Sequence, residues 1–121
     1  MSLIEVHARL GNTALFYAIL MAIWGLFRYL RRQGVESSYW GALVIAEILF
    51  VLQAALGAYL WLSGQGVAPG MHILYGVVSV LVIPAIFGFT RGDNERRAML
   101  VYGGAFLFLV GILLRAMGTA A

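Results

Sequence analysis

Long apolar stretches separated by short polar segments constrain this sequence more than any other feature. Four of them follow one another, and each is close to the roughly 20 residues that an α-helix needs to cross a bilayer. Only 11% of the residues are charged, whereas about a quarter are charged in a typical soluble domain. We therefore expect an integral membrane protein whose main partner is the lipid bilayer.

The lengths of the stretches and of their connections predict the fold. The predicted helices cover about residues 7–30, 38–62, 71–90 and 95–116. Because short connections make successive helices antiparallel neighbours, we expect a single all-α transmembrane domain over residues 1–121, folded as a four-helix up-down bundle. The first stretch follows Glu5 and has no basic leader, so it is expected to remain a helix and not to be cleaved as a signal.

The arginines predict the orientation in the membrane. All eight basic residues are arginines, and six of them lie on the side reached after the first and third helices, whereas Arg9 and Arg115 lie at the other end. Cytoplasmic loops are enriched in basic residues, so both termini are expected outside, with a bacterial or archaeal cytoplasmic membrane as the location. The arginines cluster at loops, which argues against a nucleic-acid partner. The absence of cysteine excludes disulfides and iron–sulfur clusters.

The two histidines stand in the same local pattern. His7 and Gly11 open the first helix, and His72 and Gly76 open the third. The similarity extends from HARLG to AIWGLFR and from HILYG to AIFGFTR, a weak internal repeat that gives the two helices equivalent positions. Since both helices run in the same direction, both imidazoles are expected at one depth, near the outer face.

This placement suits the ligation of one haem by two histidines. The iron binds an imidazole on each side, and a glycine at i+4 lies on the same helix face and leaves room for the flat ring. Alternatively, the histidines have their polar tips in interfacial water and the glycines serve helix packing. A zinc or copper site is weaker, because only Glu5 offers a third ligand and Met71 points away from its neighbour His72.

Other polar residues extend the candidate site. Haem propionates are anionic, so Arg9 and Arg115 could pair with them, or else snorkel to lipid phosphates. Gln53 could donate to the edge of the macrocycle or to another helix. Glu47 is a costly group inside a bilayer. It could relay protons or bind a quinone, or stay protonated and bonded to a neighbouring helix, with three candidate partners: Tyr17, Ser79 and Tyr102.

The stretch LQAALGAYLWLSGQGVAPGMHILYGVVSVLV resembles part of the haem A synthase family. There, a helix with glutamine and glycine leads through a short outer loop into a helix that opens with a haem-ligand histidine, and the matching positions are Gln53, Gly57 and His72. IEVHARLG resembles the preceding histidine helix, so His7 matches its ligand. That family has two four-helix halves, and this chain has the size of one half. Four-helix cytochrome b561-type proteins share the scheme. The family's Glu-x-x-His spacing is here Glu5-x-His7.

Together these features predict a small b-type cytochrome. One haem b would be held between the first and third helices by His7 and His72, and would transfer electrons near the outer face. The protein would be a component of a haem-dependent oxidoreductase, as a subunit of a larger redox complex or as a homodimer. Two alternatives stay open: a half-size haem A synthase-like enzyme that acts on bound haem, and a cofactor-free structural or assembly subunit.

Overall fold

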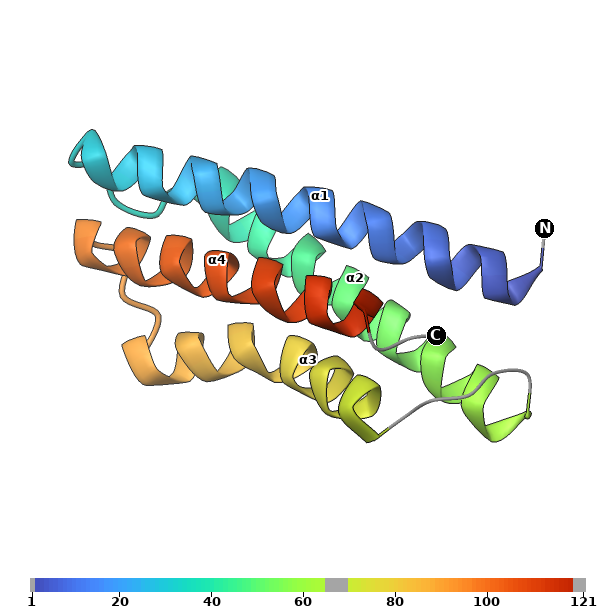
Figure 1. The fold of residues 1–121 in the computed structure, drawn as a ribbon. Coiled ribbons are helices and arrows are strands. Elements are labelled where there is room, and N and C mark those ends of the chain that lie inside the picture. The colour runs from blue at the N-terminus through green and yellow to red at the C-terminus, as the bar shows by residue number, and fades with distance from the viewer. Residues whose placement is uncertain (1, 65–69, 119–121) are drawn as a thin grey trace.

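The computed structural model describes residues 2–64 and 70–118, and this part of the chain forms four α-helices (Figure 1). They are α1 (Leu3–Leu30), α2 (Ser37–Leu62), α3 (Gly70–Thr90) and α4 (Arg96–Gly118). Each helix is long and apolar enough to cross a membrane, so the predicted all-α four-helix architecture is confirmed. The helix α1 begins earlier than the sequence indicated, because Ser2 caps it and accepts a hydrogen bond from the Glu5 backbone N–H.

The four helices form a four-sided bundle in which α1 and α3 occupy diagonal positions. Each of these two helices packs against both α2 and α4, whereas α1 and α3 do not pack against each other. Figure 1 shows α1 and α3 on opposite sides of the pair formed by α2 and α4. The two helices with similar sequences therefore have equivalent neighbours. Side chains that connect α1 to α3 have to meet on the axis of the bundle.

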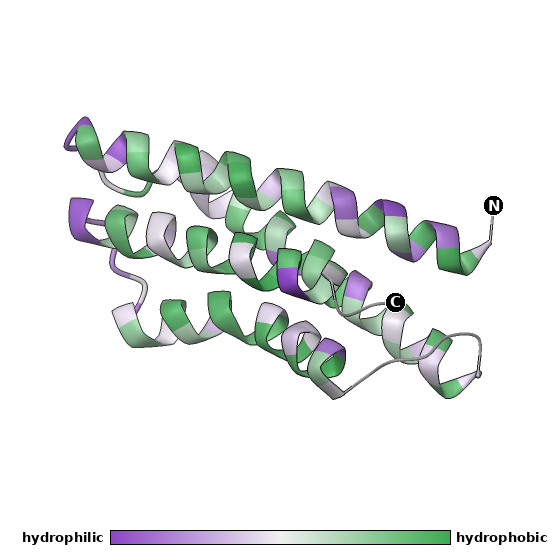
Figure 2. Cartoon of the chain, in the orientation of Figure 1, coloured by the Kyte–Doolittle hydropathy of each residue, from purple (hydrophilic) through white to green (hydrophobic). Residues whose placement is uncertain are grey.

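The two ends of the bundle differ in chemistry. The arginine end contains the connections 31–36 and 91–95, and the histidine end contains the first turns of α1 and α3 and the last turns of α2 and α4. Figure 2 shows apolar colours along most of the helices and polar colours at the arginine end and in the first turns of α1. Large apolar side chains face outward from the bundle, among them Phe16, Leu20, Ile23 and Phe89. Such a surface is compatible with lipid contact.

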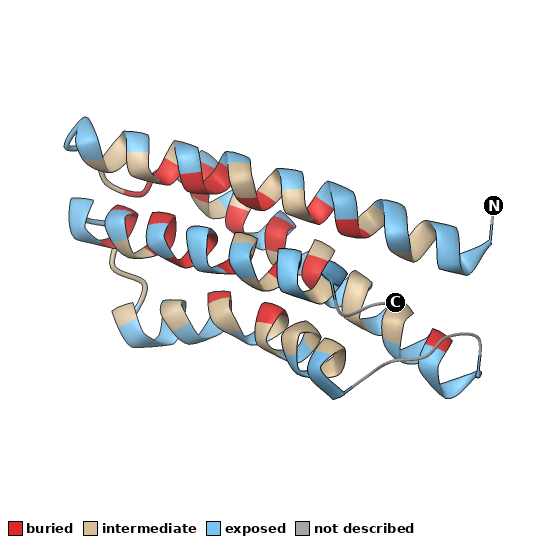
Figure 3. Ribbon diagram, viewed as in Figure 1, coloured by how far each residue is buried: buried red, intermediate tan, exposed pale blue. Residues whose placement is uncertain are grey.

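The core is concentrated in the centre of the bundle and toward the arginine end (Figure 3). The largest fully buried side chains are Tyr39, Phe50, Met99, Tyr102, Phe106 and Leu109. On α1, small residues face this core and let α4 approach closely: Ala14, Ala18, Ala22 and Gly25. Toward the histidine end burial decreases, and on α3 only Ser79 and Ile83 are buried among the described residues.

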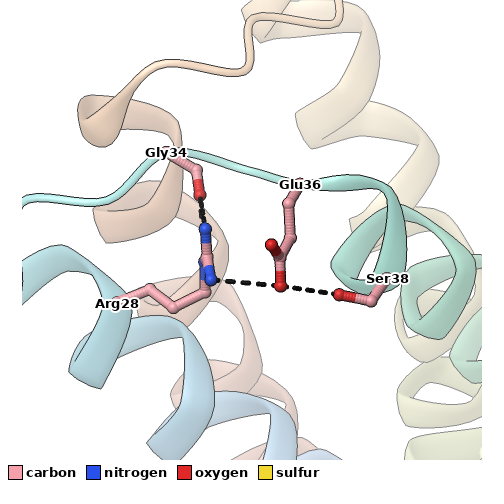
Figure 4. A network of polar contacts seen from close by, with 4 residues as sticks. All are labelled: Arg28, Gly34, Glu36 and Ser38. Carbon is pink, nitrogen blue, oxygen red and sulfur yellow. Dashed lines mark hydrogen bonds and ion pairs between the residues drawn. The ribbon is translucent and has the colours of Figure 1, made fainter.

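A polar network closes the arginine end (Figure 4). Arg28 donates to the Gly34 carbonyl oxygen from Nε at 2.9 Å and from Nη2 at 2.6 Å. Its Nη1 lies 3.2 Å from Glu36 Oε1, which also accepts a hydrogen bond from Ser38 Oγ. The side chain of Arg28 thus holds the connection between α1 and α2 in one shape.

The two connections at the arginine end are also joined to each other. The Val35 N–H donates to the Asn94 carbonyl oxygen at 2.8 Å, and Gly34 approaches Asn94 so closely that a Cβ at position 34 would overlap it. Arg96 Nε donates to the Tyr29 carbonyl oxygen at 2.8 Å, and its guanidinium lies over the Tyr29 ring at 4.0 Å. These bonds connect the end of α1 to the start of α4.

Candidate functional site

His7 and His72, which are far apart in the sequence, come together at the histidine end. Their ring centroids are 6.4 Å apart and their planes are inclined by 78°. Both residues are half-buried. Because α1 and α3 are diagonal helices without direct packing, the two imidazoles meet across the axis of the bundle. The parallel direction of the two helices explains why residues near their first turns share one depth.

The imidazole of His72 is held by α4. Its Nδ1 lies 2.7 Å from the carbonyl oxygen of Ala116. A carbonyl oxygen only accepts hydrogen bonds, so Nδ1 carries the proton and a neutral ring keeps Nε2 unprotonated. Histidines that bind metals are commonly oriented in this way, by an Nδ1–H bond to a backbone carbonyl group. This tautomer leaves Nε2 of His72 available as a metal ligand.

The imidazole of His7 lies against α2 at Gly57. A Cβ at position 57 would stand 3.1 Å from Cε1 and 3.5 Å from Nε2 of His7. The bare backbone of this glycine therefore lets the ring lie close to α2. The His7 Nδ1 is buried and has no hydrogen-bond partner among the described residues. The sequence placed Gly57 only as a position matching a family, and its contact with His7 depends on the rotation of α2.

Gln53, one helical turn before Gly57, contacts the backbone of His7. Its Nε2 donates to the His7 carbonyl oxygen at 2.7 Å, which connects α2 to the first turns of α1. Its Oε1 is buried and unpartnered within the described ranges. A Cβ at position 11 would stand 2.9 Å from Gln53 Nε2. Gly11 therefore accommodates the Gln53 amide.

The second predicted glycine has different surroundings. A Cβ at position 76 would meet no atom within 4 Å, so Gly76 borders open space in this structure. Gly11 and Gly76, which share one sequence pattern, are thus not equivalent in their contacts. Arg9 and Arg115 are both exposed at the histidine end.

Glu47 lies far from the histidines, in the half of α2 that is nearer the arginine end. Its Oε1 is buried without a partner among residues 2–64 and 70–118. Of the three partners that the sequence indicated, Tyr17 donates to the Ala42 carbonyl oxygen and Ser79 donates to the Gly76 carbonyl oxygen. The Tyr102 hydroxyl has no partner in the described part of the chain either. No helix-to-helix bond of Glu47 is therefore present there.

The two imidazoles suit a metal whose remaining ligands belong to a cofactor. Within the described residues no three His, Cys, Asp or Glu side chains are grouped so that they could hold a metal ion, which is unfavourable for a four-coordinate zinc site. A haem iron needs only two axial ligands from the protein. His7 and His72, whose ring centroids lie 6.4 Å apart, are the residues that would hold such an iron.

Comparisons of the chain with protein-family models, curated proteins and solved structures find no significant match. The interpretation of the site therefore depends on the residues and their geometry.

Proposed function

We propose that this protein is a small b-type cytochrome of the membrane, in which His7 and His72 are the axial ligands of one haem b. The observation that carries the proposal is the meeting of the two imidazoles, with centroids 6.4 Å apart, from two helices that do not otherwise pack together. The orientation of His72 by the Ala116 carbonyl oxygen supports it, because Nε2 is left to bind the iron.

Each neighbouring residue has a definite task in this proposal. Gly57 gives the His7 ring its place against α2, and the Ala116 carbonyl group fixes the tautomer of His72. Arg9 and Arg115 are exposed at the same end and pair with the propionates. A planar group can enter only if the helix ends separate. Few side chains of α3 are buried near the histidines, so the free-energy cost of this separation is small. When bound, the haem supplies one-electron oxidation and reduction.

The setting of the electron transfer follows from the arginines. The arginine end faces the cytoplasm by the positive-inside rule, so the haem lies near the outer face of a bacterial or archaeal cytoplasmic membrane. The exposed apolar surface suits the helices of a larger redox complex or a second copy of the chain. A quinone dissolved in the bilayer is a candidate small-molecule partner.

Two other functions keep specific support. The residues that resemble haem A synthase are the ones that contact His7, since Gln53 and Gly57 both lie against that residue. A half-size enzyme that oxidises bound haem is therefore the second candidate. The bond from His72 to Ala116 and the bond from Gln53 to His7 also connect helices without any cofactor, which favours a structural subunit as the third.

The deciding experiment is to purify the protein in detergent from cells with ample haem and to record reduced-minus-oxidised spectra and the pyridine haemochrome. We expect a b-type spectrum in the wild type that is lost in His7→Ala and in His72→Ala. Met71→Ala is the matched control, because Met71 precedes His72 and is 49% exposed, and it should keep the spectrum.

Each outcome selects one of the three functions. Haem O or haem A beside haem B would favour the enzyme. A folded protein that stays colourless in haem-replete cells would overturn the cytochrome and leave the structural subunit. A haem that survives both histidine substitutions would overturn the assignment of its ligands.

A further inference from the structure

Two buried polar atoms beside the histidine pair have complementary chemistry and no partner. They are Nδ1 of His7 and Oε1 of Gln53, neither of which has a partner at full hydrogen-bond distance and angle among the described residues. An imidazole nitrogen can carry a proton, whereas an amide oxygen only accepts one. Unpartnered buried polar atoms are uncommon and destabilising. Two such atoms on neighbouring side chains therefore point to one hydrogen bond that satisfies both.

The surroundings hold these two side chains next to each other. Gln53 Nε2 donates to the His7 carbonyl oxygen at 2.7 Å, and the amide packs on Gly11. The Gln53 side chain also interacts with the His7 imidazole. That ring also lies against Gly57, one turn farther along α2. One face of α2 thus contacts both the backbone and the ring of His7.

We propose that Gln53 is the positioning residue of His7, accepting its Nδ1–H on Oε1 while Nε2 of the amide holds its carbonyl oxygen, so that His7 Nε2 is left unprotonated as the ligand atom. This inference rests on the proposed function, because the orientation serves to bind a metal between the two rings. The sequence indicated Gln53 as a group for the macrocycle edge or for another helix. The structure instead assigns Gln53 to His7, the proposed iron ligand.

The two ligands are then held in the same manner by different kinds of acceptor. His72 donates from Nδ1 to a backbone carbonyl group of α4, and His7 donates from Nδ1 to a side chain of α2. A backbone acceptor cannot be altered by substitution, whereas the acceptor at position 53 can. A carboxylate there attracts the Nδ1 proton more strongly than an amide does, which makes the imidazole a stronger donor to the iron. A stronger donor stabilises ferric iron more than ferrous iron, which lowers the midpoint potential.

The test compares Gln53→Glu and Gln53→Leu with the wild-type holoprotein in detergent. We expect the haem that Gln53→Glu retains to have a lower midpoint potential in a redox titration, with a lower haem content, because a carboxylate cannot donate to the His7 carbonyl oxygen. Gln53→Leu removes the acceptor, and its affinity for haem should fall about 10-fold or more. Leu52→Ala is the control, since Leu52 is the neighbouring residue and is 50% exposed, and it should change neither quantity.

A second measurement keeps the inference separate from the proposed function. In the haem-free protein, ¹⁵N–¹H correlations of the imidazole report its tautomer, and His7 should be protonated on Nδ1 in the wild type and lose this preference in Gln53→Leu. An unchanged tautomer, potential and affinity in both variants would overturn the role of Gln53, while a haem lost in His7→Ala would still support the cytochrome. A wild type with the Nδ1–H tautomer but without haem would support the hydrogen bond and overturn the cytochrome.

Discussion

Gly25 of α1 and Gly103 of α4 face each other at a point where the two helices lie close together. A Cβ at position 25 would stand 3.1 Å from the Gly103 Cα, and a Cβ at position 103 would stand 2.9 Å from the Leu26 side chain and 3.0 Å from its backbone nitrogen. Helices approach this closely only where side chains are small. The contact therefore fixes the distance between α1 and α4 in the well-packed half of the bundle.

The variant Gly103→Ala should destabilise the protein. The added methyl group meets both the side chain and the backbone of Leu26, so the helices have to move apart. Overpacking of this kind lowers the free energy of unfolding by about 1–3 kcal/mol. Thermal unfolding followed by circular dichroism in one detergent measures the loss.

The neighbouring glycine gives a matched control. A Cβ at position 104 would meet no atom within 4 Å, and alanine is a better helix former than glycine by about 1 kcal/mol. Gly104→Ala should therefore leave the unfolding temperature unchanged or raise it. Equal destabilisation by both substitutions would contradict this prediction, because the contact with Leu26 would then not determine the result.

The substitution Arg28→Met should destabilise the protein far more than Glu36→Gln. The side chain of Arg28 is only 12% exposed and gives two hydrogen bonds to the Gly34 carbonyl oxygen, whereas that of Glu36 is 52% exposed. Loss of a charged donor to a carbonyl group costs about 1.5–3 kcal/mol, while an exposed ion pair contributes about 0–1 kcal/mol. Chemical unfolding of the two variants in one detergent compares them, and equal losses would mean that the ion pair is the main contribution.

Single cysteines can test the predicted orientation, since the native chain has none. Gln33 lies in the connection at the arginine end and Ser63 follows α2 at the histidine end, and both are exposed. We expect a membrane-impermeant maleimide to label Ser63→Cys in intact cells and Gln33→Cys only after lysis. The opposite result would place the histidine end in the cytoplasm.

The two glycines of the repeated pattern should respond differently to alanine. Gly11→Ala brings a methyl group to 2.9 Å from Gln53 Nε2, which displaces the amide from the His7 carbonyl oxygen. We expect a severalfold lower haem content per protein, measured by the pyridine haemochrome. Gly76→Ala meets no neighbour and should retain its haem. A loss in Gly76→Ala would instead mean that the cofactor lies directly on that glycine, as the sequence pattern implied.

The sequence alone predicts the helices of this fold but not how each helix is rotated about its own axis. The length of each apolar stretch predicted the helices, and their alternating direction predicted that His7 and His72 share one end. The contacts of Gln53 with His7 required the structure. The reason is that a helix in a bilayer is apolar on all faces, so residue type does not separate the core from the lipid surface. Phe50 is buried whereas Phe16 is 69% exposed.

The bonds that join the two connections at the arginine end have a mechanical consequence. Val35 is bonded to Asn94, and Arg96 to Tyr29, so the helices share a fixed base there. Any spreading of α1 from α3 has to pivot about this base and is widest at the opposite end, where the imidazoles lie. The arginine-rich connections thus act as a hinge, and the bundle opens at the end that carries His7 and His72.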